Sequence, residues 1–586
     1  MGKPIHVLGV SCHYHDAAAA LVSDGRIVAA AQEERFNREK YSNAFPIQAI
    51  NACLQEGGIA VWDLDAVAFY EKPYLKLART VVGHVNAWPA SFPNFRAMLP
   101  AWLEERLSFP VTVRDRLGYD GPVLFVKHHM SHAASAFYAS GFDEAAILTV
   151  DGIGEWASAT WGSARGTEIR IEQELRYPNS LGLLYSIVST YLGFRVFEGE
   201  GKVMALAAFG APTYLDAFRR CVPSCPDGSF RMDPAFFSLN RGTRMYSRAF
   251  LDLFGPERAP DTELETRHKD VAASLQARVE EIVLDMARHV HAQTGQRRLC
   301  AAGGVFLNVL TNRRILDETP FEDLFVQPAA GDAGSAIGAA SFVSHARLGV
   351  PRGSRMESAF LGPAYSRDRI RRLLATDGVA SRLLEGDELA AFVAGKLAEG
   401  QIVAWFQGRM ECGPRALGHR SILADPRRAD MKEVLNARVK HREWFRPYGV
   451  SVLEEEVGAF FDLARPSPYM LLVGRVKPEK AALIPSALHV DGTCRLQSVT
   501  EAIHGAFYRV IREFFRLTGV PMILNTSFNV REPIVCTPED ALATFLRTDM
   551  DWLVLDGFVV EAQRDRTKVP APALPARHGL DAARLL

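Results

Sequence analysis

Two segments of the chain repeat one pattern, in which a short apolar strand ends in a polar loop and continues into further strands. The first reads IHVLGVSCHYHDAAAALVSDGRIVAAAQEERF, and its Asp24-Gly25 pair between alternating apolar runs is a strong hairpin signal. The second reads AAILTVDGIGEWASATWG, where strand residues 146–150 lead into Asp151-Gly152. Helical stretches follow both segments. The pattern therefore predicts a duplicated α/β core.

A duplicated core of this kind is typical of the actin-like ATPase and sugar-kinase superfamily, and we expect it in residues 1–355. The segment 348–367 is rich in Gly, Pro, Ser and Arg, as in a connection between domains. A second α/β pattern follows, with a helix around Asp387–Gly400, a strand at 402–408 and further strands near 470–475 and 521–525. It predicts a second domain over 356–563. The proline-containing residues 564–586 are expected to form a surface tail.

Length and charge narrow the class of protein. The 586 residues suggest two to four domains at about 150 residues each. The 67 Lys and Arg residues balance 68 Asp and Glu residues. The chain is therefore not globally basic, and we expect no nucleic-acid partner. No apolar run reaches the ~18 residues of a membrane span, and the N-terminus lacks the layout of a signal peptide. We expect a cytoplasmic protein with no membrane partner and with reduced cysteines.

Two histidines and two aspartates form a candidate metal site. His128 and His132 are four residues apart, so a helix would present both imidazoles on one face. Asp151 ends an apolar strand, and Asp332 lies in AAGDAGSAIGAA, where small residues permit close backbone approach. Two imidazoles and two carboxylates suit a borderline metal such as iron or zinc. A pair of histidines that merely packs on a helix face is the alternative.

Glycine-rich stretches provide candidate phosphate loops. Gly303 and Gly304 lie in CAAGGVFLN beside Asn308, and backbone N–H groups of such loops can approach phosphates. Lys202 lies in EGEGKVMALAAFG together with two glutamates. Tight packing of a helix on a sheet also uses paired glycines, and a charged surface turn would explain Lys202 equally. Both alternatives stay open here.

A basic segment lies in the second half of the chain. From Gly408 to Pro447 there are ten Lys and Arg residues and five Asp and Glu residues. Arginines held between glycines suit bidentate recognition of phosphate, whereas a solvated basic helix needs no glycines. The short reach of the cluster favours a small polyanion over a nucleic-acid groove or structural ion pairs. Its candidate members are Arg409, Arg415, Arg420, Lys440, Arg442 and Arg446, together with Arg495, Asn525, Ser527 and Arg531 further along the chain.

Taken together, these motifs resemble the O-carbamoyltransferase family of nodulation-factor and antibiotic biosynthesis, which includes the tobramycin, cephamycin and ansamycin carbamoyltransferases. The matching strings occur in family order from residue 9 to about residue 545. They are GVSCHYHDAAA, QEERFNREKYSNAFP, YEKPY, HHMSHAASAF, DGIGEWAS, EGEGKVMALA, GGVFLN, GDAGSAIGAA, GRMECGPRALGHRSILADPR, VKHREWFRP, HVDGTCRLQ and LNTSFNVREPIV. The sequence departs from the family pattern at His419, where Asn is usual, and at Cys412, where an aromatic residue is frequent.

The resemblance implies a fusion of two modules. The N-terminal part is similar to the actin-like metalloprotein that transfers threonylcarbamoyl groups to tRNA, and the C-terminal part is similar to YrdC-like α/β synthases of threonylcarbamoyl-adenylate. It implies that carbamoyl phosphate and ATP, with Mg²⁺, give carbamoyl-adenylate and pyrophosphate in the C-terminal domain. A hydroxyl of a natural-product acceptor then attacks the adenylate in the N-terminal domain.

The family motifs also assign roles to residues of this chain. Metal ligation falls on His128, His132, Asp151 and Asp332, with iron expected and zinc or manganese as alternatives. His15, with Asp16, is the candidate base for the acceptor hydroxyl. Lys440, Arg495 and Arg531 are assigned to the reacting phosphates. The further binding residues are Lys202, Gly303, Gly304, Asn308, Arg409, Arg415, Arg420, Arg446, Met470, Asn525 and Ser527.

Two other functions remain open from sequence. A small-molecule kinase of the actin-like superfamily would release ADP rather than pyrophosphate, and a non-catalytic nucleotide-binding regulator would need no His/Asp set. Residues 74–120, with several aromatic side chains, are expected to shape the acceptor mouth for a bulky or apolar glycoside or polyketide. The same aromatics also suit a helix core. A homodimer is left open.

Overall fold

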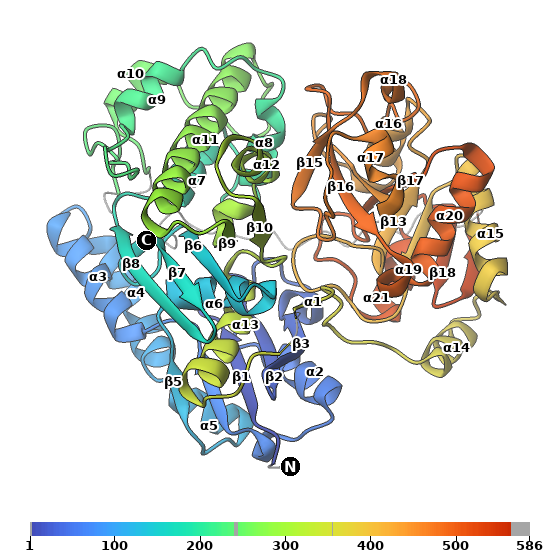
Figure 1. Cartoon of the computed structure of the whole chain (residues 1–586), viewed down its shortest axis with the longest axis horizontal. Helices are drawn as coiled ribbons and strands as arrows, with labels where there is room; N and C mark the ends of the chain where they lie inside the picture. Colours follow the sequence, from blue (N-terminus) through green and yellow to red (C-terminus); the bar gives the residue numbers. More distant parts are fainter. Residues whose placement is uncertain (1–2, 240–243, 354, 564–586) are drawn as a thin grey trace. The chain divides into compact units, whose positions relative to one another are not determined.

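The computed structural model describes residues 3–239, 244–353 and 355–563 of the chain (Figure 1). Within these residues the chain divides into two compact units. The first unit holds 3–33 and 41–356, and the second holds 34–40 and 357–563. The short helix α1 (Glu34–Asn37) thus groups with the second unit. The domain ranges expected from sequence, 1–355 and 356–563, are continuous and place this helix in the first domain. The expected tail, 564–586, lies outside the described residues.

The first unit contains two five-stranded sheets with one shared topology. In the order β3-β2-β1-β4-β5, β2 runs antiparallel to both of its neighbours, whereas β1, β4 and β5 are parallel. The order β8-β7-β6-β9-β10 repeats the same directions. The strands are β1 (His6–Ser11), β2 (Ala18–Ser23), β3 (Arg26–Gln32), β4 (Ala66–Phe69), β5 (Val123–Phe125), β6 (Glu144–Val150), β7 (Ala157–Arg165), β8 (Glu168–Arg176), β9 (Arg298–Ala302) and β10 (Asp323–Val326). The predicted duplicated α/β unit is confirmed.

The predicted hairpin at Asp24-Gly25 is confirmed in detail. The strands β2 and β3 pair antiparallel across these two residues, with Ser23 opposite Arg26. Asp24 has a φ of 46° and Gly25 a φ of 74°, the left-handed values that a two-residue hairpin turn of type I′ requires at both positions. Glycine meets that requirement without strain, and aspartate is among the residues that tolerate it.

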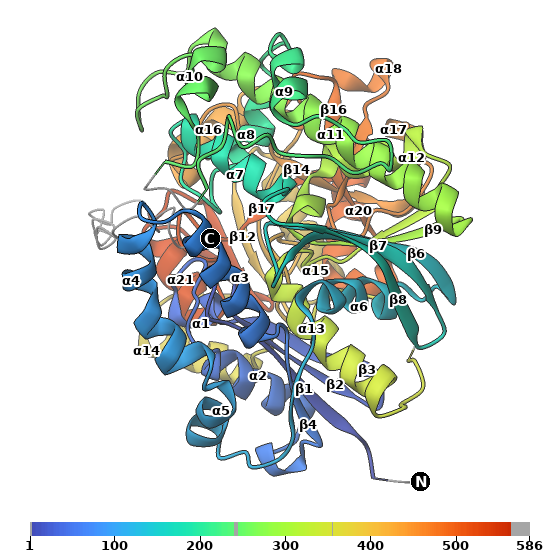
Figure 2. The ribbon, with the colours of Figure 1, turned by 90° about the vertical axis from the view of Figure 1, so that its left-hand side faces the viewer.

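Two helices of the first unit, α6 and α13, pack closely because both carry small residues (Figure 2). A Cβ on Gly338 of α13 would lie 1.7 Å from the Ser131 carbonyl oxygen of α6, and one on Gly9 of β1 would lie 1.9 Å from the Ala336 carbonyl oxygen. The helices of this unit are α2 (Ile47–Gly57), α3 (Pro73–Asn86), α4 (Phe92–Ala101), α5 (Phe109–Leu117), α6 (His128–Ser140), α7 (Leu181–Tyr191), α8 (Glu200–Ala207), α9 (Leu215–Cys221), α10 (Arg248–Phe254), α11 (Thr266–Thr294), α12 (Val309–Glu318) and α13 (Asp332–Phe342).

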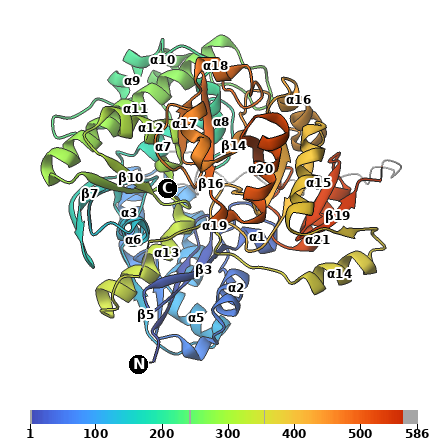
Figure 3. The ribbon, with the colours of Figure 1, turned by 45° about the vertical axis from the view of Figure 1, so that its right-hand side comes forward.

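The second unit is built on a nine-stranded mixed sheet of order β11-β19-β18-β12-β13-β17-β14-β16-β15. Its strands are β11 (Arg382–Leu383), β12 (Val403–Phe406), β13 (Arg420–Ala424), β14 (Gly449–Leu453), β15 (Leu472–Arg475), β16 (Thr493–Val499), β17 (Met522–Ser527), β18 (Trp552–Leu555) and β19 (Phe558–Glu561). Besides α1, its helices are α14 (Arg367–Thr376), α15 (Gly386–Ala398), α16 (Met431–Leu435), α17 (Val457–Phe460), α18 (Pro478–Ala481), α19 (Glu501–His504), α20 (Ala506–Thr518) and α21 (Pro538–Leu546). Helices α15 and α20 lie side by side (Figure 3).

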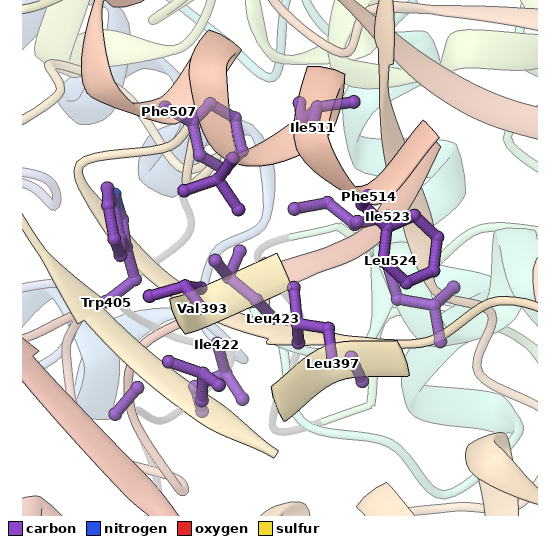
Figure 4. Close-up of a cluster of buried hydrophobic side chains, with 14 of the residues drawn as sticks. Val393, Leu397, Trp405, Ile422, Leu423, Phe507, Ile511, Phe514, Ile523 and Leu524 are labelled. Carbon is purple, nitrogen blue, oxygen red and sulfur yellow. The ribbon is translucent and has the colours of Figure 1, made fainter. Parts of the chain in front are cut away.

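The core of the second unit forms where α20 packs on this sheet (Figure 4). Phe507, Ile511 and Phe514 recur at the spacing of one helix face and are buried with Trp405 of β12 and Leu524 of β17. The α/β class predicted for the second half, in which a YrdC-like domain was expected, is confirmed. Among the described residues, no helix combines the length and the apolar character that crossing a membrane would require.

Candidate metal centre and candidate anion site

The first unit brings together the four residues of the predicted metal set. His128 and His132 lie on successive turns of α6, Asp151 directly follows β6, and Asp332 begins α13. One ligand atom from each residue can be chosen so that all four lie within 4.8 Å of one another, and all four residues are buried. The i, i+4 spacing read from sequence thus places both imidazoles on the face of α6 that meets the two carboxylates.

The distances within this set fit a shared cation. His128 Nε2 lies 3.2 Å from His132 Nε2 and 3.2 Å from Asp151 Oδ2. The distance from His132 Nε2 to Asp332 Oδ1 is 3.5 Å, and that from His128 Nε2 to the same oxygen is 3.7 Å. Ligand atoms about 2.1 Å from one ion lie roughly 3.0–3.4 Å apart. Asp332 Oδ1 is buried and has no hydrogen-bond donor among the described residues, so the oxygen is available to a metal ion.

The electrostatics of the set favour ionised carboxylates. Burial alone would raise the pKa of Asp332, but His15 and His128 lower it to about 2. The pKa of Asp151 also lies well below its usual value, because His128 and His132 outweigh the effect of burial. Burial lowers the pKa of His132, whereas the nearby carboxylates of Asp151 and Asp332 raise it to about 9. A cation that binds here therefore competes with a proton on His132.

Three further groups hold the ligands in place. The buried Glu155 carboxylate accepts the backbone N–H of His128 at 3.0 Å, at the N-terminus of α6. The Gly304 N–H donates to Asp151 Oδ1 at 2.7 Å, and Ser335 Oγ lies 3.3 Å from His132 Nδ1. Sequence reasoning missed Glu155 and Ser335. Both lie inside the strings DGIGEWAS and GDAGSAIGAA, but no spacing rule connects either residue to α6.

The predicted base His15 lies beside the same set. Its Nδ1 is hydrogen-bonded to Asp16 Oδ2 at 2.9 Å, and its Nε2 lies 3.6 Å from Asp332 Oδ2. Its ring packs on Phe197 with centroids 4.3 Å apart. Burial lowers the pKa of His15, but Asp332 and Asp16 together raise it to about 9. The structure thus brings His15 and Asp16 to the four predicted ligands.

The remaining predicted residues of the first unit make other contacts. Gly303 has a φ of 103°, and a Cβ there would lie 2.2 Å from the Val150 carbonyl oxygen, so this glycine lets the loop approach β6. Asn308 caps α12 by accepting the Thr311 N–H, and its side chain exchanges hydrogen bonds with Gln276. Lys202 Nζ lies 3.9 Å from Glu198.

The second unit concentrates positive charge around Lys440. Burial lowers the pKa of Lys440 well below its usual value, and the charges of Arg442 and Arg446 lower it further. Burial and Arg446 lower the pKa of Arg415 to about 10, and burial with Arg415 and Arg446 lowers that of Arg495. We call Arg415, Lys440, Arg442, Arg446 and Arg495 the cation cluster. Because like charges repel and burial disfavours each charge, the cluster favours a bound anion.

Donors without hydrogen-bond partners within the cation cluster also indicate an anion site. Arg415 Nε and Arg495 Nε are buried and have no acceptor among the described residues. The Lys440 ammonium donates to the Asn529 carbonyl at 2.9 Å and to Asn529 Oδ1 at 2.8 Å, and it also contacts Ser527. The Met470 side chain and Arg495 Nε lie close together, since a Cβ on Gly449 would be 3.2 Å from both the Met470 sulfur and that nitrogen.

The other predicted phosphate-binding residues are engaged in the fold. The buried Arg420 guanidinium stacks 3.6 Å from the Phe406 centroid and donates to the carbonyls of Gln407 and Gly408. Arg409 donates to the carbonyls of Leu361 and Gly362.

Two more of them also make internal contacts. The exposed Arg531 donates to the His441 carbonyl at 2.8 Å. The Asn525 amide donates to Ser451 Oγ at 2.9 Å and to the Ala416 carbonyl, while its buried Oδ1 has no donor among the described residues. Arg409, Arg420 and Arg531 thus donate to backbone carbonyls, whereas Arg415 and Arg495 of the cation cluster each keep a buried Nε without an acceptor among the described residues.

Two family models match the chain. The carbamoyltransferase N-terminus model matches residues 6–341, and the carbamoyltransferase C-terminus model matches residues 394–562. An uncharacterised protein from Synechocystis is 44% identical, over 95% of this chain and 96% of that protein. Nodulation protein NolNO from Sinorhizobium fredii is 39% identical, over 93% of this chain and 79% of that protein. Nodulation protein NolO from Bradyrhizobium diazoefficiens is 40% identical, over 74% of this chain and 78% of that protein.

Solved structures show distant likeness only. A ROK hexokinase from Thermus thermophilus has a TM-score of 0.27 at 14% identity, covering 57% of this chain and 98% of that chain. Full-length HypF in a phosphate- and nucleotide-bound form has a TM-score of 0.31 at 13% identity, covering 58% of this chain and 55% of that chain.

Proposed function

The chain belongs to the carbamoyltransferase family, and on this premise we propose that it is an ATP-dependent O-carbamoyltransferase that works in two steps. The second unit makes carbamoyl-adenylate from carbamoyl phosphate and ATP. The first unit then transfers the carbamoyl group to a hydroxyl of a natural-product acceptor, a glycoside or a polyketide. The observation that carries this proposal is the presence of two chemically different sites, the buried cation cluster and the His/Asp set, each inside its own unit.

In the first step the cation cluster offsets the charges of two polyanionic substrates, one of which is ATP with its Mg²⁺. Carbamoyl phosphate must first lose its phosphate to water, because the adenylate retains only the carbamoyl group. An oxygen of the resulting carbamate attacks the α-phosphorus of ATP. The bond from that phosphorus to the bridging oxygen breaks, and pyrophosphate leaves.

In the second step the acceptor hydroxyl attacks the carbamoyl carbon. A bond forms between the hydroxyl oxygen and this carbon, the bond from the carbon to the phosphate oxygen breaks, and AMP leaves. His15 takes the hydroxyl proton at Nε2 in its neutral form, which a cation bound at Asp332 would favour by offsetting the carboxylate charge that raises the His15 pKa. Asp16 accepts the hydrogen bond from Nδ1, which holds the imidazole in the tautomer whose Nε2 is a base.

The metal set supports this second step. His128, His132, Asp151 and Asp332 would hold a divalent ion, for which we propose iron, with zinc or manganese as alternatives, because mixed imidazole and carboxylate donors suit borderline ions. When bound, the ion would polarise the carbamoyl carbonyl and offset the charge of the adenylate phosphate. Glu155 holds the backbone of His128 at the N-terminus of α6, and Ser335 Oγ supports the His132 imidazole at Nδ1.

Product analysis tests the proposed function. The full-length protein is incubated with carbamoyl phosphate, ATP, Mg²⁺, iron(II) and a panel of hydroxylated glycosides and polyketides. We expect pyrophosphate and AMP to appear and one acceptor to gain the mass of a carbamoyl group. Release of ADP in place of pyrophosphate would identify a small-molecule kinase instead. Binding of ATP without any turnover would identify a nucleotide-binding regulator.

A further inference from the structure

Helix α3 has an inverted distribution of polarity. Two of its apolar residues, Tyr74 and Val85, are 71% and 65% exposed. Its buried face is instead largely polar and carries Lys76, Arg79, Thr80 and His84 beside Pro73. A surface helix normally buries its apolar residues, so this helix is not held in place by apolar burial alone. A polar interior face of this kind is expected where a helix lines a site for a polar ligand.

The two cations of this face differ in their partners. Lys76 forms a buried ion pair with Glu71 at 2.5 Å, and its ammonium lies 4.5 Å from the centroid of the Tyr14 ring. Arg79 is 3% exposed, and its side chain makes no hydrogen bond or ion pair among the residues that the structure describes. Its guanidinium lies 5.5 Å from the centroid of the Tyr177 ring.

The charges around Arg79 leave it uncompensated. Burial lowers its pKa, and Glu71, the carboxylate that opposes this effect, is already paired with Lys76. Arg106 adds a second positive charge and uses one of its donors on the His13 carbonyl at 2.6 Å. A buried guanidinium without an anion or acceptors is costly, whereas a planar fork of donors matches a carboxylate or another oxyanion in bidentate geometry.

A series of contacts connects Arg79 with the candidate transfer site. Lys76, one turn before Arg79, lies over the Tyr14 ring, and this ring contacts the His15 ring with centroids 4.8 Å apart. His15 in turn faces Asp332 at 3.6 Å. The charges of Arg79, Asp332 and Asp151 all act on the pKa of Tyr14, so Arg79 and the two carboxylates lie around this one ring. An acceptor whose hydroxyl is at His15 would have to extend past the Tyr14 ring to meet Arg79.

We propose that Arg79 binds an oxyanion carried by the hydroxyl acceptor, so that the preferred acceptor is an acidic glycoside or polyketide. This inference rests on the proposed function and names the substrate class of its second step. Arg79 forms no covalent bond in the reaction. It orients the acceptor by charge and hydrogen bonding, and it discriminates against neutral acceptors of the same shape.

Two matched probes test the proposal with the full-length protein. p-Nitrophenyl β-D-glucuronide carries hydroxyls and a carboxylate, and its methyl ester lacks only the charge. Carbamoylation of each is followed by mass spectrometry to obtain kcat/KM, and binding of each without ATP is followed by saturation-transfer NMR. The variants are Arg79→Gln, Arg79→Lys and the control Arg96→Gln, which changes an exposed arginine of α4.

The wild type and Arg96→Gln are expected to prefer the acid by tenfold or more, both in binding and in kcat/KM. Arg79→Gln should abolish this preference while leaving the ester unchanged, and Arg79→Lys should retain part of it because the charge remains. A wild type that binds acid and ester equally would overturn the proposal. So would an Arg79→Gln variant that loses activity on both probes in parallel, as expected if Arg79 holds the adenylate phosphate or only supports the fold.

The binding arm separates this proposal from the proposed function. If no carbamoyl transfer or pyrophosphate release occurs, the two-step function fails. The NMR comparison of acid and ester in the wild type and in Arg79→Gln still decides whether Arg79 is an oxyanion site.

Discussion

Replacing Glu155 with glutamine should weaken metal binding without changing any of the four proposed ligands. Glu155 is 6% exposed, and its carboxylate accepts the Lys72 N–H at 2.8 Å and the His128 N–H at 3.0 Å. These residues lie at the N-termini of α3 and α6, where backbone N–H groups lack partners within the helix. Glu155→Gln keeps the size of the side chain and one acceptor oxygen but removes the negative charge.

The magnitude follows from these contacts. A negative charge at a helix N-terminus stabilises the helix by about 0.3–1 kcal/mol, and by up to about 2 kcal/mol where it is partly buried. A hydrogen bond to a charged group contributes about 1.5–3 kcal/mol, and part of this is lost with the charge. Groups that orient metal ligands typically change metal affinity by about 10–100-fold, or about 1.4–2.8 kcal/mol. We therefore expect Glu155→Gln to bind the metal about 10–100-fold more weakly.

Cobalt(II) is a suitable spectroscopic probe for this measurement. The full-length protein is titrated with Co²⁺ in competition with a chelator, and the visible absorption of the bound ion is recorded. Glu168→Gln is the matched control, because the Glu168 side chain on β8 is 63% exposed and distant in sequence from α6. An affinity of Glu155→Gln within twofold of the wild type would refute the role assigned to this carboxylate.

Three substitutions and one pH dependence extend these tests. Gly338→Ala places a Cβ 1.7 Å from the Ser131 carbonyl oxygen, so it should destabilise the first unit by about 1–3 kcal/mol or more, seen as a lower Tm, and should weaken Co²⁺ binding in the same titration. Arg415→Gln should weaken ATP binding about tenfold or more in calorimetry and change Tm little, because Arg415 Nε has no acceptor within the described residues. Arg420→Gln should mainly lower Tm, because the Arg420 guanidinium donates to the backbone carbonyls of Gln407 and Gly408. Burial and the neighbouring arginines lower the pKa of Lys440, and a bound polyanion should raise this pKa again. ATP binding should therefore be accompanied by the uptake of a proton, and the affinity for ATP should fall as the pH rises. Calorimetry in buffers of different ionisation enthalpy measures this uptake, and equal heats in all buffers would contradict it.

Local patterns in the sequence were sufficient for much of the fold and for the metal set. The Asp24-Gly25 turn is specified by two residues that accept left-handed φ values, and its hairpin forms as predicted. His128 and His132 are related by helix geometry alone, which any helical segment would satisfy. Asp151 and Asp332 were grouped with them because one ends an apolar strand and the other lies among small residues, and the family motifs assigned the same four residues.

Contacts between distant segments could not be read from the sequence. Glu155 lies 27 residues after the His128 N–H that it accepts, and its carboxylate could equally have faced solvent. The alternation of arginines and glycines around Arg420 does not reveal which guanidinium turns toward backbone carbonyls and which stays within a cluster of like charges. The grouping of residues 34–40 with the second unit is likewise a property of the folded chain.

The central claim, that the two units perform separate half-reactions, is tested most directly by two variants assayed for both products. Asp332→Asn should release pyrophosphate from carbamoyl phosphate and ATP at close to the wild-type rate but transfer no carbamoyl group to the acceptor. Lys440→Met should release no pyrophosphate yet transfer the carbamoyl group from supplied carbamoyl-adenylate. Asp216→Asn, at a side chain 92% exposed, should behave as the wild type. Normal transfer by Asp332→Asn, or loss of both half-reactions in each variant, would contradict the claim.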